Sequence, residues 1–141
     1  MATQEESEDF INLGIVLNEK GEVLMVRRTQ KEVGSDGSVL TWVFPGGRQK
    51  YSESRAECVK RKVLSRTGYE IESLKEISLR AHHQFPVIIV YHLCKLVSPK
   101  QIQKPQEPHE VAEIRWVKPE EIKKLITTDL DPKVSRQLGL S

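Results

Sequence analysis

The stretch from Gly46 to Tyr69 constrains the fold of this chain more than any other. It opens with two adjacent glycines, which free the backbone for a tight loop, and continues as a polar run to Ser52. Apolar side chains then recur every three or four residues, which predicts a helix with one buried face. Ser52 or Glu53 suits the N-cap, and Gly68 suits the position just past the helix end. The buried face is expected to contain Ala56, Val59, Val63 and Thr67.

The rest of the chain reads as strands followed by short helices. Strands are expected, in chain order, at residues 10–17, 23–26, 40–44, 77–83, 87–96 and 113–117. Asn18 to Gly21 is a turn signal, so the first two strands should form a hairpin. Helices are expected from Pro119 to Ile126 and from Asp131 onward. Residues 98–109 hold three prolines and no apolar periodicity, which indicates an exposed loop. This order predicts an α/β sandwich.

Length and composition restrict the class of protein. A chain of 141 residues suits one domain, which would bury roughly two-thirds of its unfolded surface. We expect a flexible N-terminus at residues 1–9 and one domain over residues 10–141. The net charge of +2 gives no argument for nucleic acid or anionic lipid as a partner. The acidic start lacks the features of a signal peptide. No apolar stretch approaches the ~20 residues that a membrane span needs. The two cysteines, Cys58 and Cys94, do not have Cys-x-x-Cys spacing. A cytoplasmic location is therefore expected.

The most constrained stretch also carries a family pattern. Trp42-Val43-Phe44-Pro45-Gly46 leads into Gly47, then five residues precede Glu53, and seven more precede Arg61. This spacing resembles the Nudix box. The matching positions are Gly47, Glu53, Arg61, Val63 and Gly68, with Tyr69 at the final apolar position. The resemblance extends to the closing strand at residues 113–117 and the Pro-Glu-Glu-Ile that follows it. It implies a Nudix-type α/β/α sandwich with a mixed sheet.

Three positions depart from the family pattern. Lys62, Ser65 and Arg66 stand where the pattern has glutamates. As a family, Nudix enzymes hydrolyse a nucleoside diphosphate linked to another group, with magnesium or manganese held by carboxylates on one helix face. Residues 58, 62, 65 and 66 would share such a face, and its two cations repel a divalent ion and attract phosphate. We therefore expect no bound metal, and a phosphate site made by Gly46, Gly47, Arg48, Lys62 and Arg66.

The remaining acidic candidates follow from the same resemblance. Glu53, Arg61 and Gly68 are expected to shape the loop and helix, with Glu53 and Arg61 paired through Glu57. Some family members draw an extra ligand or base from the loop before the closing strand, which makes Glu110 the catalytic candidate, with Glu53 as a second. Glu57 is the candidate metal ligand.

Other reactive side chains are interpreted as structural. The histidines, His82, His83, His92 and His109, show no i,i+4 spacing and are expected to be solvated or packed. Cys58 has no identifiable base partner and is not expected to be a nucleophile. The aromatic residues Trp42, Phe44, Phe85 and Tyr91 are expected in the core, although one could stack on a base at a pocket mouth.

Three functions remain open from the sequence. The favoured one is a Nudix-fold module that binds a nucleotide or another diphosphate-containing ligand, with little or no pyrophosphohydrolase activity and no cofactor. The alternative is an active hydrolase of nucleoside diphosphate-X compounds, with magnesium or manganese held by Glu53, Glu57 and Glu110. The third is a protein-interaction module without a ligand. The expected partner is a phosphorylated, nucleotide-like small molecule, with no membrane and no nucleic acid.

Overall fold

The computed structural model describes residues 6–33, 39–82, 85–106, 110–126 and 130–140. The strands are β1 (Glu6–Leu17), β2 (Val23–Val33), β3 (Val39–Val43), β4 (Gly46–Lys50), β5 (Ile71–Ala81), β6 (Ile88–Leu96) and β7 (Val111–Val117). The helices are α1 (Arg55–Thr67), α2 (Ile122–Leu125) and α3 (Pro132–Gln137), and a 3-10 turn, η1 (Pro119–Glu121), leads into α2.

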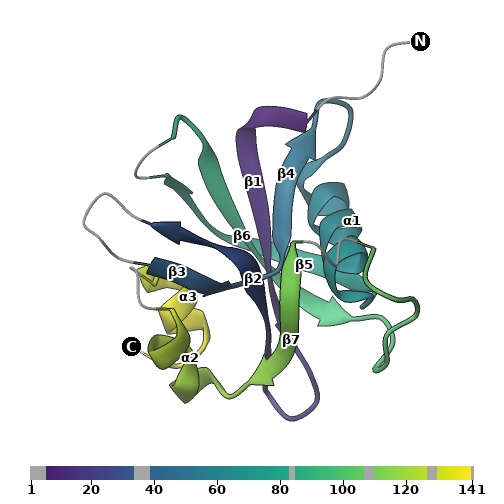
Figure 1. Ribbon diagram of the computed structural model, residues 1–141, viewed down its shortest axis with the longest axis vertical. Helices are drawn as coiled ribbons and strands as arrows, with labels where there is room; N and C mark the ends of the chain where they lie inside the picture. Colours follow the sequence, from purple (N-terminus) through teal and green to yellow (C-terminus); the bar gives the residue numbers. More distant parts are fainter. Residues whose placement is uncertain (1–5, 34–38, 83–84, 107–109, 127–129, 141) are drawn as a thin grey trace.

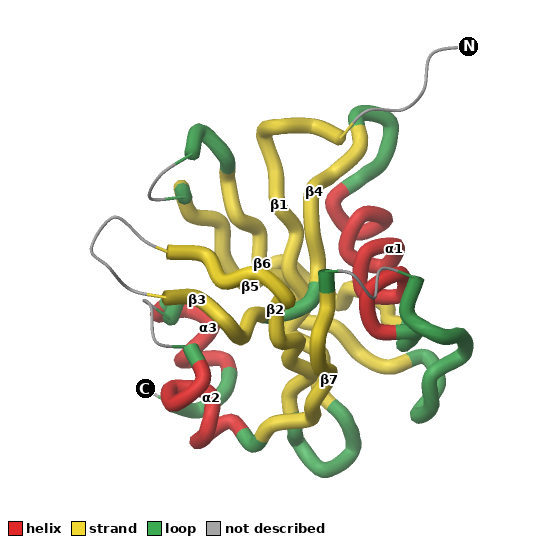
Figure 2. Tube along the Cα trace, viewed as in Figure 1, coloured by secondary structure: helices red, strands yellow, loops and turns green. Residues whose placement is uncertain are grey.

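One mixed sheet connects the described strands. Its order is β3-β2-β1-β6-β5, with β4 paired to β1 and β7 paired to β2. β1 and β6 run parallel, and β1 pairs antiparallel with both β2 and β4. Figure 1 shows α1 on one side of the sheet and α2 and α3 on the other. Figure 2, coloured by secondary structure, shows the strands at the centre of the molecule and the helices outside them. The expected sandwich with a mixed sheet is confirmed.

Two neighbouring residues of β1 show why each face of the sheet has its own core. Side chains alternate between the faces of a strand, so Ile15 and Val16, both fully buried, point in opposite directions. Ile15 belongs to a cluster with Ile122 of α2 and Val134 of α3. Val16 belongs to a second cluster with Val63 of α1. The sheet therefore packs helices on both faces, and α1 is fixed against the face to which Val16 points.

Helix α1 begins at a capping box and ends at a left-handed glycine. The Ser54 hydroxyl accepts from the Glu57 amide at 3.1 Å, and the Glu57 carboxylate accepts from the Ser54 amide at 2.9 Å. Gly68 takes a φ of 79°, a conformation that glycine adopts without strain. The expectation of Ser52 or Glu53 as N-cap is wrong, because Ser54 satisfies the first amides of the helix.

The loop after β6 covers the C-terminal end of α1. Helix ends leave carbonyl groups without partners, and here the loop supplies donors. The Gln101 side chain donates to the Thr67 carbonyl at 2.6 Å, and the Gln106 amide donates to the Ser65 carbonyl at 2.7 Å. The described part of this segment is largely exposed, as expected. Residues 107–109 lie outside the described residues.

The buried face of α1 differs from the expected one at its first turn. Val59, Val63 and Thr67 are buried as expected. Ala56 is exposed, and Cys58 is buried instead. The reason is the position of β4, which covers Cys58: its thiol donates to the Gly47 carbonyl at 3.5 Å.

Pairing between strands also moved several expected boundaries. β1 begins at Glu6, so the expected boundary after residue 9 falls within it. β2 runs on to Val33, β5 begins at Ile71, and β7 begins at Val111. β4 occupies residues 46–50, where a loop was expected, because their backbone pairs with β1. Hydrogen bonds to a neighbouring strand extend each of these segments beyond what side-chain pattern indicates.

The first hairpin, the C-terminal helices and the core aromatic residues are largely as predicted. The hairpin through Asn18–Gly21 is confirmed by the pairing of Leu17 with Val23. The helix expected at residues 119–126 divides into η1 and α2, and Asp131 caps α3 as expected. Three of the four expected core aromatics are buried, namely Trp42, Phe44 and Tyr91. Phe85 is 51% exposed, because it lies in the turn between β5 and β6.

Candidate functional site

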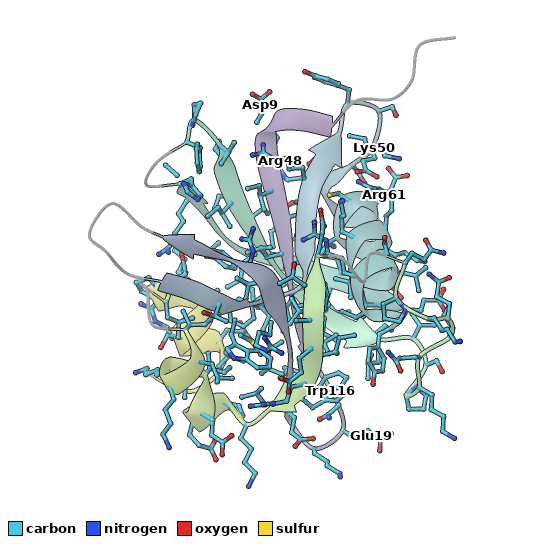
Figure 3. The ribbon with its side chains drawn as sticks, in the orientation of Figure 1. Asp9, Glu19, Arg48, Lys50, Arg61 and Trp116 are labelled. Carbon is cyan, nitrogen blue, oxygen red and sulfur yellow. The ribbon has the colours of Figure 1, made fainter. Side chains whose placement is uncertain are left out.

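Glu53 and Arg61 join the start of α1 to β4 through a two-point ion pair. Glu53 Oε1 lies 2.6 Å from Arg61 Nη2, and Arg61 Nε lies 2.9 Å from Glu53 Oε2. Glu53 Oε1 also accepts from the Lys50 amide at 2.9 Å, and Arg61 Nη2 donates to the Arg48 carbonyl at 3.2 Å. Figure 3 shows Arg61 on α1 beside Lys50 at the end of β4. The pairing is direct and does not pass through Glu57.

The charge of Glu53 is stabilised by these contacts. Partial burial by itself would raise the pKa of the carboxyl group. The hydrogen bond from Arg61, the hydrogen bond from the Lys50 amide and the Arg61 charge together outweigh burial, so the pKa of Glu53 is lowered. Glu53 is therefore ionised at neutral pH and committed to holding the loop.

Lys62 and Cys58 lie beneath β4 and not on an open face of the helix. Lys62 is 6% exposed, and its side chain runs along Gly47, where an added Cβ would come within 2.9 Å of Lys62 Cδ. Cys58 is fully buried, and burial raises the pKa of its thiol to about 11. A thiol with so high a pKa is protonated at neutral pH, so it is a poor nucleophile.

Arg66, one turn further along α1, reaches the loop before β7. Its Nη2 lies 2.8 Å from Glu110 Oε2, and the two side chains are 25% and 44% exposed. The Glu110 carbonyl in turn accepts from the Thr29 amide at 3.2 Å, which fixes the loop to β2. The structure thus brings together Arg66 and Glu110, which were predicted to have separate roles.

The five residues expected to bind phosphate do not all converge. Gln49 faces α1, because its Oε1 accepts from Asn12 Nδ2 at 3.0 Å. Arg48, its neighbour in β4, therefore points to the opposite face, and Figure 3 shows it away from Arg61. Gly46 lies against the backbone of β1, where a Cβ would clash with the Asn12 carbonyl. The α1 side therefore holds three of the five expected residues, namely Gly47, Lys62 and Arg66.

A chain of buried and partly buried polar side chains connects β5 to this loop. Asn12 Nδ2 donates to Gln49, so Asn12 Oδ1 accepts from His92 Nε2 at 2.9 Å, and His92 Nδ1 then accepts from the Ser73 hydroxyl at 2.9 Å. Gln49 Nε2 completes the chain by donating to the Glu53 carbonyl at 3.0 Å. Burial is the main cause of the lowered pKa of His92. This network was not predicted; its signal in the sequence is two polar residues, Asn12 and His92, inside apolar strands.

The remaining histidines and cysteines build no further site among the described residues. The His82 ring accepts from the Phe85 amide at 3.3 Å, while His83 and His109 lie outside the described residues. Cys58 and Cys94 are both buried and free. Within the described ranges, no three side chains of His, Cys, Asp or Glu lie close enough to hold a metal ion. No described helix is long and apolar enough to cross a membrane.

Comparison with known proteins identifies the family. A family model described as the NUDIX domain matches residues 12–138, nearly the whole chain. The chain belongs to the Nudix family. The unit formed by β4, the Glu53–Arg61 pair and α1 is the part that resembles the Nudix box in sequence, and we refer to it by that name.

Solved structures of Nudix proteins share this fold. A Nudix hydrolase from Nitrosomonas europaea matches with a TM-score of 0.72 and 16% identity, over 98% of this chain and 73% of that one. An ADP-ribose pyrophosphatase from Streptococcus suis matches with a TM-score of 0.62 and 20% identity, over 95% and 89%. A MutT protein from Methanosarcina mazei matches with a TM-score of 0.62 and 22% identity, over 96% and 93%. At these identities the likeness concerns the fold.

The candidate carboxylates of this Nudix site each have a protein partner. Glu53 binds Arg61, and Glu110 binds Arg66. Glu57 closes the capping box with Ser54, and hydrogen bonds from the Ser54 backbone and side chain lower the pKa of Glu57. The side chains along α1 therefore offer cations and engaged carboxylates rather than one open group of oxygen ligands.

Proposed function

We propose that this Nudix protein binds a nucleotide-like or other diphosphate-containing ligand beside α1 without a divalent ion, and that it has little or no pyrophosphohydrolase activity. The observation that carries the proposal is the ion pair between Arg66 and Glu110. The family pattern has a glutamate at position 66, and the loop before the closing strand supplies a further ligand in some members. Here a guanidinium bound to a carboxylate takes up both positions.

The donor set around α1 suits an anion better than a divalent cation. Magnesium and manganese prefer several carboxylate and water oxygens, whereas Lys62 and Arg66 add two positive charges to this face. A guanidinium binds phosphate with the same forked geometry with which it binds carboxylate. A phosphate group can therefore replace Glu110 on Arg66. Lys62 lies beneath Gly47 of β4, so its positive charge would attract the phosphate through the strand without direct contact.

The alternative hydrolase would need Glu53, Glu57 and Glu110 to hold the metal together. Glu53 is committed to Arg61 and to the Lys50 amide, and Glu57 to the helix cap. Recruiting them would break the Glu53–Arg61 pair and the capping box that hold the Nudix box. These commitments favour the binding protein over the hydrolase.

A phosphate-release assay over nucleoside diphosphate derivatives, with magnesium or manganese, tests the loss of hydrolysis. Metal-assisted chemistry lowers the barrier by several kcal/mol, and each ~1.4 kcal/mol is a factor of ten in rate. We expect no turnover above the uncatalysed background. Turnover on the order of one per second would overturn the proposal, because such rates are typical of enzymes.

Replacement of Glu110 by Gln separates the two functions by the direction of its effect. If Glu110 only neutralises Arg66, Glu110→Gln removes the negative charge beside the guanidinium and strengthens the binding of ADP-ribose in EDTA. If Glu110 is a ligand or base of an active hydrolase, the same change abolishes turnover. Glu113→Gln is the matched control, because Glu113 binds Arg27 of β2 and Arg115 of its own strand, β7.

The other parts of the proposal come from the sequence. They are a single domain over residues 10–141, a cytoplasmic location and a phosphorylated small molecule as the partner. Two free, buried cysteines support a reducing compartment. The Nudix fold supports a phosphorylated ligand, because related structures include an ADP-ribose pyrophosphatase.

A further inference from the structure

A pocket of about 360 Å³, open to solvent, lies between β5 and α3, on structure that the Nudix box does not use. Its lining residues are Lys75, Glu76 and Ile77 of β5, and Lys133, Arg136 and Gln137 of α3. We call it the β5–α3 cavity. Its volume falls in the range of roughly 300–1,000 Å³ that is typical of small-molecule sites. Figure 1 shows α3 on the side of the sheet opposite α1.

Three positively charged residues, all exposed to solvent, line this cavity. The side chains of Lys75, Lys133 and Arg136 make no hydrogen bond or ion pair with any residue that the structure describes. The one carboxylate in the lining, Glu76, is already bound to Arg55 of α1 at 2.8 Å. The cavity therefore carries an excess of uncompensated positive charge, which attracts a multiply charged anion.

The backbone of β5 is irregular where it lines the cavity. The register against β6 shifts between Ser73 and Lys75, and again between Glu76 and Ser78. Lys75 and Glu76 thus lie between the two irregularities, and Ile77 lies within the second one. Bulges of this kind re-aim side chains and are frequent next to binding sites. Lys75 and Ile77, two residues apart on this edge strand, line the same cavity.

A buried aspartate fixes the opposite wall. Asp131, 3% exposed, caps α3 by accepting from the Lys133 and Val134 amides at 2.8 and 3.2 Å. Its other oxygen accepts from the Ser78 hydroxyl of β5 at 3.0 Å. This contact holds α3 against β5. Lys133, Arg136 and Gln137 are spaced by three and four residues, so they share one helix face.

We propose that the β5–α3 cavity binds a small molecule that carries two or more phosphoryl groups, independently of the Nudix box. Arg136 supplies a forked donor, Lys75 and Lys133 supply point charges from the facing wall and the first helical turn, and the Gln137 amide supplies a neutral donor. The site needs no metal ion, because its protein groups already carry the positive charge.

Titration of the isotopically labelled protein with pyrophosphate in EDTA, followed by two-dimensional NMR of backbone amides, tests this proposal. We expect saturable shifts at residues 75–77 and 132–137. The variant Lys133→Ala/Arg136→Ala should weaken this binding about tenfold or more, since two charge-assisted hydrogen bonds are lost. Lys124→Ala, an exposed lysine of α2 outside the cavity, is the control and should leave the shifts unchanged.

The same spectra separate this site from the Nudix box. Shifts at residues 46–50 and 58–66 report the Nudix box, and their presence or absence leaves the expectation for the cavity unchanged. Shifts confined to those residues would overturn the cavity proposal. So would shifts at the cavity that never saturate, or that sulfate at the same ionic strength reproduces in full, because both would show charge screening alone.

Discussion

At the scale of single residues, two ion pairs of the Nudix box behave differently because their surroundings differ. Glu53 and Arg61 form a two-point contact whose carboxylate is only 12% exposed, so the carboxylate would be poorly hydrated if Arg61 were removed. The ion pair between Arg66 and Glu110 has its carboxylate 44% exposed, so a ligand can approach it from solvent. The Glu53–Arg61 pair is therefore suited to holding the loop, and the Arg66–Glu110 pair to binding a ligand.

The structural role of the first pair predicts a loss of stability. Arg61→Met keeps the length of the side chain but leaves the charge of Glu53 partly buried and unpaired. We expect the free energy of unfolding to fall by about 1–3 kcal/mol in a denaturant titration. Arg27→Met removes an exposed ion pair with Glu113 and should cost no more than about 1 kcal/mol. Equal losses in the two variants would contradict this role.

The buried His92 predicts a second effect, on the pH dependence of stability. Burial lowers its pKa below the ordinary 6.5, so the unfolded chain binds a proton that the folded protein does not. Stability from this group is complete above pH 6.5 and is lost as the pH falls below it, with a limiting slope of ~1.4 kcal/mol per pH unit.

Denaturant titrations between pH 7 and pH 5 measure this slope, and His92→Gln is the comparison, because glutamine does not titrate. The difference in slope between the two proteins isolates His92 from the other histidines. Parallel curves would show that His92 titrates alike in the folded and unfolded states.

At the scale of elements, α1 rests on the sheet through its buried face. Val63 is fully buried in the cluster that α1 shares with β1, and Ala56 is exposed on the same helix. Val63→Asp should destabilise the protein by about 3 kcal/mol or more, because an unpaired charge would enter the core. Ala56→Asp, an acidic residue in the exposed first turn, should leave stability unchanged or slightly higher. A mild effect of Val63→Asp in thermal unfolding would contradict the packing described.

The elements also show what the sequence could predict. Periodic apolar residues located α1, and the retained glycines and spacing predicted the Nudix fold, because both signals are local. β4 was missed, because Gly46 to Lys50 are polar or glycine and become a strand only by pairing with the distant β1. Ala56 was misplaced because the sequence fixes the period of a helix but not its rotation against the sheet. The Arg66–Glu110 pair joins residues 44 apart, which no local pattern indicates.

At the scale of the whole molecule, the Nudix box and the β5–α3 cavity lie on opposite faces of one sheet. Arg55 of α1 binds Glu76 of β5, which links the two regions at the sheet edge. The polar chain through His92 passes between the same elements and ends on the Nudix box loop. The fold is that of its hydrolase relatives, whereas the charges along α1 suit an anion. Our central claim is therefore that this protein binds a diphosphate without a metal.

Isothermal titration calorimetry with ADP-ribose, in EDTA and in excess magnesium, tests this claim most directly. We predict the same dissociation constant in both buffers and weaker binding as salt rises, because exposed charges are screened over ~8 Å at physiological ionic strength. Lys62→Glu/Arg66→Glu should remove the heat of binding at the Nudix box, while Lys124→Glu should not. Binding that requires magnesium, or no binding in either buffer, would contradict the claim.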